Sequence, residues 1–172
     1  MRRRVDMEGR DGFTVIEIMI VIAILGILVV LAVGNFGGMN EKYKVESETK
    51  QLYADLMDAR GRAMQRNRWF FVQIGSTGYA TYEDGPMPDG DTSRNGNDTL
   101  LANVTVRHAT AITLAGGGSL FGFNRNGIAN DTGTIYIASS SRPDYDCITI
   151  LSTRIKMGQY LGSFPGGSCV EK

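Results

Sequence analysis

Glu17 is the residue of this chain whose chemistry is hardest to explain by folding alone. It lies inside residues 12–33, GFTVIEIMIVIAILGILVVLAV, a segment that is otherwise apolar and long enough for a helix across a bilayer core of roughly twenty residues. A carboxylate in that setting costs roughly 2.5–3.5 kcal/mol on insertion scales, and the segment contains no cation to offset it. If the chain were cut between Gly12 and Phe13, the new amine of Phe13 would lie about one helical turn from Glu17.

The same residues form a pattern that is similar to a known signal. Gly12, Phe13 and Glu17, followed by the apolar run 18–28, resemble the class III signal of type IV pilins and type II secretion pseudopilins. The resemblance implies that a prepilin peptidase cleaves after Gly12 and methylates the nitrogen of Phe13. In a filament, Glu17 would neutralise the Phe13 amine of the neighbouring subunit and so fix the axial register. An ordinary signal anchor with a chance acid is the alternative.

The flanking residues predict how the chain is divided. Residues 1–12 are polar and contain four arginines, and basic residues before an apolar helix hold that end in the cytoplasm. We therefore predict a prepilin leader at 1–12, a transmembrane and filament-core helix at 13–38, and a globular head at 39–172. Both Met1 and Met7 are compatible with the start of the protein.

Composition limits what the head can be. About 130 residues follow the apolar segment, enough for one domain with its own core. The 22 glycines and 4 prolines favour strands and turns over a helical bundle. A formal net charge of zero and a pI of about 6.6 argue against a globally basic nucleic-acid binder.

The chain contains two cysteines, Cys147 and Cys169. Because the expected topology places the head outside the cytoplasm, we predict a disulfide between them. It would pin the C-terminal tail to a strand and stabilise the head by roughly 3 kcal/mol. Two reduced thiols are the alternative.

Hydrophobic periodicity predicts the elements of the head. Glycines at 34, 37 and 38 are expected to interrupt the first helix, and from about 40 to 67 the pattern is helical again. The apolar positions that recur at helical spacing are Val45, Leu52, Leu56, Ala59 and Ala63. After residue 67 the period is that of strands. The expected strands are 69–74, 79–82, 100–107, 112–114, 119–123, 134–138 and 147–156.

Three stretches of the head narrow the resemblance. Residues 56–67 and the aromatic strand after them look like the end of the helix in the GspH/FimT family. Residues 121–127, FGFNRNG, resemble a strand and turn of that family, and residues 148–156 resemble its closing strand. The family implies an α+β fold, in which a long N-terminal helix packs on two small antiparallel sheets, and a minor subunit rather than the bulk pilin.

Arg154 and Lys156 form a second candidate site. On one strand both side chains would face the same side, where a pair of cations can contact phosphates without reading sequence. Residues 153–156 resemble in part a Gly-Arg-x-Arg motif that some FimT-like minor pilins carry and that is linked to DNA uptake, but Thr and Lys replace its Gly and its second Arg. Arg125 and Arg142 belong to the same hypothesis. A solvated strand face is the alternative.

The polar loop 84–98 contains oxygen donors without a convincing metal pattern. Asp89, Asp91 and Asn95 would be the ligands of a calcium ion, but neither register has both the glycine and the closing glutamate of an EF-hand. We therefore expect no metal, and a solvated or partner-binding loop. The one histidine, His108, has no nucleophile motif around it, so we expect neither catalysis nor a cofactor.

The sequence therefore predicts a minor pilin or pseudopilin at or near the tip of a type II secretion pseudopilus or type IV pilus, where it aids the initiation of assembly. Its expected partners are other subunits, the prepilin peptidase and the assembly platform. It would lie in the bacterial inner membrane as a single-pass protein with a cytoplasmic N-terminus, and later in a periplasmic or extracellular filament. A DNA-binding minor pilin for uptake in natural transformation is the alternative.

Overall fold

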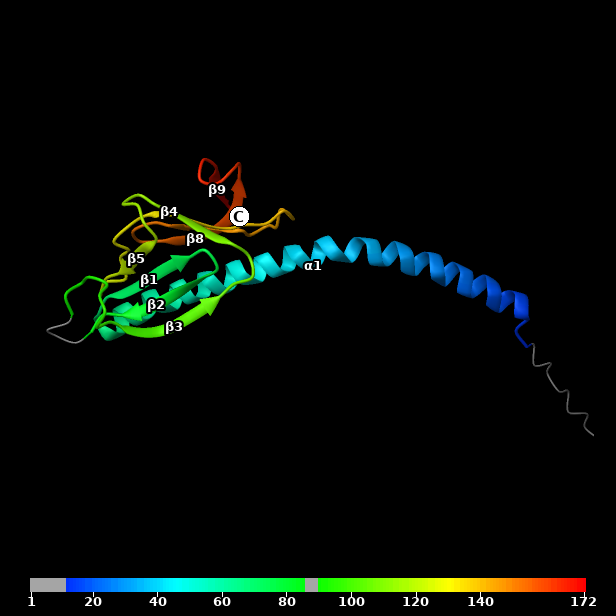
Figure 1. The fold of residues 1–172 in the computed structure, drawn as a ribbon, viewed down its shortest axis with the longest axis horizontal. Coiled ribbons are helices and arrows are strands. Elements are labelled where there is room, and N and C mark those ends of the chain that lie inside the picture. Colours follow the sequence, from blue (N-terminus) through cyan, green and yellow to red (C-terminus); the bar gives the residue numbers. More distant parts are fainter. Residues whose placement is uncertain (1–11, 86–89) are drawn as a thin grey trace, which may run out of the picture. The chain divides into compact units, whose positions relative to one another are not determined.

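The computed structural model describes residues 12–85 and 90–172, with the backbone alone for 31–38. One long helix, α1 (Val15–Arg66), precedes all of the strands in the described residues (Figure 1). The chain divides into two compact units, Met1–Gly38 and Met39–Lys172. The second unit is called the head below.

The described part of the first unit is an exposed apolar helix. Every large apolar side chain from Phe13 to Val30 is at least 47% exposed. Helical backbone continues through Gly34, Gly37 and Gly38, so the interruption expected from these glycines was wrong. A glycine costs only about 1 kcal/mol in a helix, which neighbouring residues can outweigh. Within the part of the chain that is described, no helix has both the length and the apolar character needed to cross a membrane.

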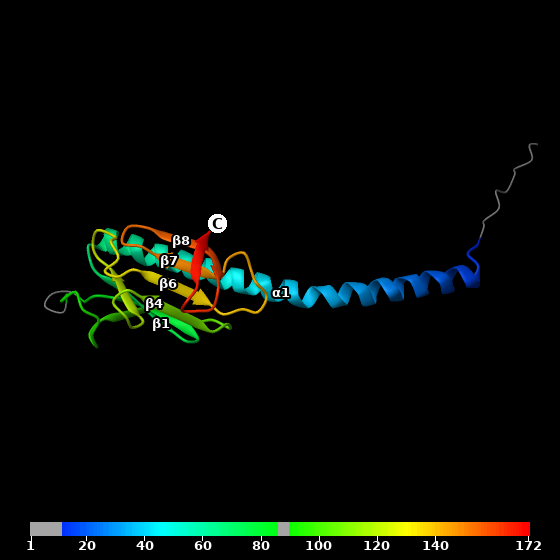
Figure 2. The same cartoon turned by 90° about the horizontal axis from the view of Figure 1, so that it is seen from above.

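The head contains two antiparallel sheets beside the C-terminal part of α1 (Figures 1 and 2). The first sheet has the order β3-β2-β1-β5 and consists of β1 (Phe70–Gly75), β2 (Gly78–Glu83), β3 (Thr99–Thr105) and β5 (Leu120–Phe123). The second has the order β4-β6-β7-β8-β9 and consists of β4 (Thr110–Leu114), β6 (Gly133–Ile137), β7 (Cys147–Ile150), β8 (Ile155–Leu161) and β9 (Ser168–Glu171).

A single hydrophobic cluster joins α1 to both sheets. Phe121 and Phe123 of β5 are fully buried in it, with their rings edge to face and their centroids 5.6 Å apart. The helix contributes the five positions that its periodicity predicted, each no more than 1% exposed: Val45, Leu52, Leu56, Ala59 and Ala63. Because burying a leucine or phenylalanine contributes roughly 1.5–3 kcal/mol, this cluster is the main source of the stability of the head.

The C-terminal part of the second sheet differs from the sequence prediction. Residues 147–156 were expected to form one strand, but β7 ends at Ile150 and the chain turns back into β8. Leu151 and Arg154 close this turn through two backbone hydrogen bonds, of 2.8 and 3.3 Å. The last strand, β9, was not predicted, and it pairs with β8 at the edge of the sheet.

Candidate functional site

The N-terminal motif lies at the start of α1. The Thr14 carbonyl accepts hydrogen bonds from the backbone N–H groups of Glu17 and Ile18, at 3.1 and 3.3 Å. The Thr14 hydroxyl accepts a further hydrogen bond from the Glu17 N–H at 3.3 Å. Thr14 is therefore the N-cap, and Glu17 occupies the third helical position, where the helix dipole favours a negative charge.

Gly12 and Phe13 precede the helix and are exposed. The Phe13 side chain is 80% exposed. A β-carbon placed on Gly12 would have no atom within 4 Å, and the backbone there does not have a positive φ. Neither packing nor backbone conformation in the described structure therefore requires glycine at position 12.

Cys147 and Cys169 form a disulfide bond that joins β7 to β9. Three aromatic side chains, Tyr136, Tyr160 and Phe164, gather next to it, with ring centroids 4.8–5.6 Å apart. Tyr136 lies opposite Cys147 in the sheet, and Tyr160 lies opposite Cys169. The disulfide and the aromatic rings together attach the short C-terminal strand to the head.

Arg154 lies directly before β8, and Lys156 is its second residue. Arg154 closes the turn between β7 and β8, whereas Lys156 lies within β8 and forms an ion pair with Glu171. The single strand expected over residues 147–156 was wrong, because Ser152 and Thr153 form a turn between β7 and β8. The shared face of Arg154 and Lys156 stays a prediction. Arg154 is exposed, and its side chain has no partner among the described residues, so the pair presents one free cation rather than two.

The three oxygen donors weighed as calcium ligands, Asp89, Asp91 and Asn95, are only partly described. Asp89 lies outside the described residues. Asn95 donates its side-chain N–H to Asp91 Oδ2 at 3.2 Å, and Asp91 Oδ1 accepts the Ser93 N–H at 2.8 Å. No group of three or more acidic, histidine or cysteine side chains that could hold a metal ion occurs within residues 12–30, 39–85 and 90–172. These loop side chains hold the backbone of the loop itself.

Comparisons with known proteins assign the chain to a family. A family model described as type II transport protein GspH matches residues 48–153, which is more than half of the chain, and a model of the prokaryotic N-terminal methylation motif matches residues 7–33. The chain belongs to the GspH family. The chain is also similar in structure to the minor pseudopilin EpsH from the type 2 secretion system of Vibrio cholerae, with a TM-score of 0.50. The match has 13% sequence identity and covers 67% of this chain and 97% of that chain. No curated protein sequence gives a significant match.

These findings confirm two predictions for the GspH-family chain. The resemblance to the pilin and pseudopilin superfamily is confirmed by both family models, and the α+β fold is confirmed by the helix and the two antiparallel sheets. The methylation motif is typical of proteins that are anchored in a membrane and then enter a filament.

The sequence analysis did not anticipate an ionic cluster around His108. The ring nitrogens Nδ1 and Nε2 of His108 lie 2.7 Å from Glu48 Oε2 and 2.6 Å from Glu41 Oε1. Glu48 also accepts the backbone N–H groups of Arg107 and His108, at 3.0 and 3.4 Å. Burial alone lowers the pKa of His108, but the hydrogen bonds to Glu41 and Glu48 outweigh it and raise the pKa overall. The cluster attaches the connection between β3 and β4 to α1.

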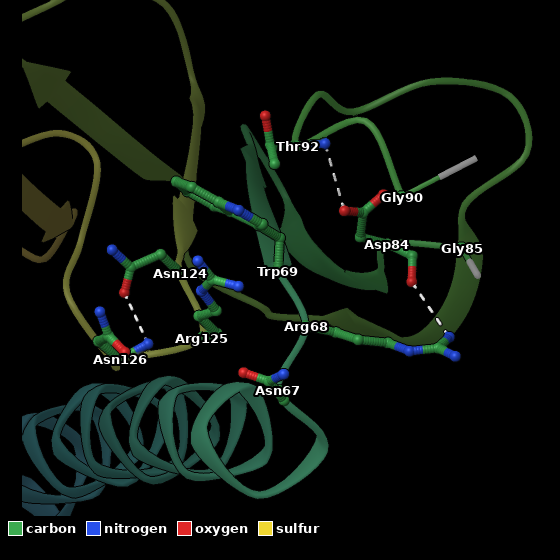
Figure 3. Close-up of a pocket in the computed structure, with 10 residues that line it drawn as sticks. All are labelled: Asn67, Arg68, Trp69, Asp84, Gly85, Gly90, Thr92, Asn124, Arg125 and Asn126. Carbon is green, nitrogen blue, oxygen red and sulfur yellow. Dashed lines mark hydrogen bonds between the residues drawn. The ribbon is translucent and has the colours of Figure 1, made fainter. Parts of the chain in front are cut away.

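A second feature that sequence reasoning missed is a polar pocket of about 580 Å³, called the Trp69 pocket below (Figure 3). Three connections of the GspH-family head form it. Asn67, Arg68 and Trp69 lie between α1 and β1, the residues Asn124, Arg125 and Asn126 follow β5, and the rest of the lining comes from the connection between β2 and β3. No motif in the sequence indicates such a pocket, because its walls lie far apart along the chain.

Two of the walls are held by local hydrogen bonds. Asn67 has a φ of 56° and ends α1, with the Arg68 N–H donating back to the Ala63 carbonyl at 3.2 Å, as in a Schellman cap. On the opposite wall, the Asn124 Oδ1 atom accepts the N–H groups of Asn126 and Ile128 at 2.9 and 3.0 Å. Both walls are thus short turns with few alternative conformations.

Proposed function

We propose that this chain is a minor pseudopilin of a type II secretion system, a structural subunit at or near the tip of the pseudopilus that aids the initiation of assembly. Membership of the GspH family and the methylation motif support this proposal. The similarity of its fold to a minor pseudopilin is compatible with it. We do not propose an enzymatic activity.

In this proposal a prepilin peptidase cuts between Gly12 and Phe13 and then methylates the Phe13 nitrogen. The methylation-motif match and the exposure of both residues at the start of α1 support the cut at this point. Gly12 has no structural reason to be glycine, which is expected if the peptidase is what requires it.

The observation that carries the proposal is the position of Glu17 on an unburied apolar helix. The large apolar side chains from Phe13 to Val30 are exposed, so their burial requires a bilayer or other subunits. Once they are buried, the carboxylate of Glu17 has low-dielectric surroundings in which an unpaired charge is costly. The terminal amine of Phe13 on a neighbouring subunit is a partner of opposite charge, and pairing with it fixes the axial register between subunits.

Before assembly the subunit would cross the inner membrane once, with its N-terminus in the cytoplasm. Four arginines in residues 1–12 support this orientation. After assembly it would lie in a filament in the periplasm or outside the cell. Its partners would be other pseudopilin subunits, the peptidase and the assembly platform.

Uptake of DNA is the less supported alternative. Lys156 is already paired with Glu171, and Arg154 lies on a turn rather than on the same strand. A protein surface that binds the phosphates of DNA needs several free cations along its length. Of these two residues only Arg154 is free of a partner among the described residues, so they do not form such a surface.

The variant Glu17→Ala tests the proposed role in assembly. We expect Glu17→Ala to insert in the membrane and to be cleaved, but to be recovered in sheared or pulled-down filaments at least roughly tenfold less than the native chain, because the neighbouring amine loses its partner. Asp58→Ala is the matched control, since Asp58 is an exposed acid on the helix surface of the head. Equal recovery of Glu17→Ala and the native chain would exclude the register role.

A further inference from the structure

The Trp69 pocket contains an arginine whose charge is not neutralised. Arg125 is exposed at the tip of the turn after β5, and its guanidinium has no hydrogen bond or ion pair with any residue that the structure describes. The other arginine of the pocket, Arg68, lies 3.8 Å from Glu83 and donates to the Asp84 carbonyl at 3.5 Å. Glu83 also pairs with Arg66. Arg125 is therefore the arginine of the pocket that has no carboxylate partner among the described residues.

The acid of the pocket is buried and only half satisfied. Asp84 is 3% exposed, its Oδ2 atom accepts the Thr92 N–H at 3.3 Å, and its Oδ1 atom has no hydrogen-bond partner among the described residues. Burial raises the pKa of Asp84, against the lowering effect of the Thr92 N–H. Figure 3 shows Arg68 and Asp84 on one side of the pocket and Arg125 on the other, near Trp69. The side of the pocket that contains Arg125 therefore favours an anion.

Trp69 gives the same side of the pocket a flat apolar wall. Its indole stacks on Phe71, with the ring planes 13° apart and the centroids 6.1 Å apart, which fixes the orientation of the ring. Gly122 makes room for this arrangement, because a β-carbon there would lie 2.8 Å from the Phe71 ring. The indole N–H has no acceptor among the described residues, so a ligand could accept its hydrogen bond.

The turn that presents Arg125 is fixed to α1. The Arg60 side chain donates to the Gly127 carbonyl at 2.8 Å. Gly127 has a φ of +69°, and a β-carbon there would lie 2.8 Å from the Met64 sulfur, so the turn and the helix approach closely. A guanidinium on such a turn binds with little loss of backbone freedom, although its own side chain remains to be ordered.

We propose that the Trp69 pocket binds the carboxylate of an acidic side chain of a partner polypeptide, with Arg125 as the charged contact and Trp69 as the apolar wall. A planar guanidinium matches a carboxylate through two parallel hydrogen bonds. Single-stranded nucleic acid also uses aromatic rings and arginine, but it needs a run of cations along the backbone. The pocket has one free arginine among the described residues, which does not form such a run. This surface lies in the head and includes neither Phe13 nor Glu17, so the inference goes beyond the proposed function.

Trp69 is the single tryptophan of the chain, so its fluorescence reports on the pocket directly. The full chain in detergent micelles would be titrated with acetylated hexaglutamate, with hexaglutamine and with a dT12 oligonucleotide. We expect a saturable change in fluorescence with hexaglutamate alone. In Arg125→Glu the apparent affinity should fall roughly tenfold or more, because the one charged contact is removed.

Arg154→Glu is the matched control, since Arg154 is also an exposed and unpaired arginine on a turn of the head. It should bind hexaglutamate like the native chain. Arg125→Gln removes the cation without adding an acid and should also lose binding, and the thermal unfolding midpoint of each variant verifies that it folds. The proposal is overturned if hexaglutamate causes no saturable change, if Arg125→Glu and Arg154→Glu weaken binding equally, or if dT12 binds in its place. None of these outcomes depends on Glu17, so the pocket and the filament role fail or succeed separately.

Discussion

One helix serves two regions of this protein in opposite ways. In α1 between Val15 and Val30 the large apolar side chains are exposed around the whole helix, whereas in the head the same helix buries one side completely. Leu25 is 53% exposed and Leu52 is 0% exposed, although both are leucines in the interior of the helix. Sequence pattern accounts for the difference, because the first region is apolar on every side and the second alternates with charged residues.

The difference separates what the chain supplies itself from what it must obtain from other molecules. The head closes its own core, since α1 and both sheets contribute to one hydrophobic cluster within residues 45–155. The apolar surface of the first region is far larger than a soluble monomer usually exposes. Folding of the head and burial of the first region are therefore expected to respond to different mutations.

The largest expected effect is that of shortening a leucine in the core. Leu52→Ala should lower the free energy of unfolding of the head by about 2–5 kcal/mol, because it leaves a cavity between α1 and the sheets. Leu25→Ala removes the same atoms from an exposed position and should leave that free energy unchanged. Urea unfolding of the full chain in detergent, followed through Trp69, measures both. Similar losses for the two variants would mean that the two regions fold as one unit.

The C-terminal strand is the part of the head that depends least on the core. Three of the four residues of β9 are exposed, and β9 lies at the edge of its sheet. The disulfide between Cys147 and Cys169 closes a separation of 22 residues, so its loss should lower the free energy of unfolding by about 3 kcal/mol. Replacing both cysteines by serine and measuring urea unfolding tests this. Ser163→Ala, in the connection between β8 and β9, is the control and should unfold like the native chain.

The elements of the head were predictable where a local pattern determines them. The five buried positions of α1 follow from helical spacing alone, and the hairpin of β1 and β2 lies within one or two residues of its prediction. The turn between β7 and β8 was missed because Ser152 and Thr153 are weak turn signals beside glycine, proline, asparagine or aspartate. The N-cap of α1 was predictable from the sequence, since Thr14 and Glu17 have the spacing of a capping box. It was missed because Glu17 was interpreted only as a charge within an apolar segment.

The surfaces of the head could not be predicted, because they join residues that are far apart in the sequence. His108 is 60 residues from Glu48 and 67 from Glu41, and the Trp69 pocket combines three separate connections. A lone histidine or a lone arginine has no pattern that reveals its partner. Only the paired strands and the packed helix bring these side chains together.

The smallest expected effect concerns pH and the His108 cluster. The pKa of His108 is raised in the folded head, so the charged ring stabilises the fold below its unfolded pKa of about 6.5, and this stabilisation is lost as the pH rises through the folded pKa. We expect a loss on the order of 1 kcal/mol for the contact with Glu48, which is nearly as buried as His108.

Urea unfolding of the full chain from pH 6 upward would measure this change. His108→Gln keeps a side chain of similar reach but cannot become charged, so its stability should vary much less over the same range. The chain has no other histidine, which limits the groups that titrate in this window. If stability rises with pH in the native chain, or falls equally in His108→Gln, the cluster does not attach the β3–β4 connection to α1 through a charged ring. A fall confined to the native chain would mean that an ion pair across its surface helps to hold the head together. The apolar segment before the head, residues 13–38, contains a single charged residue, Glu17, and so cannot form such a pair within itself.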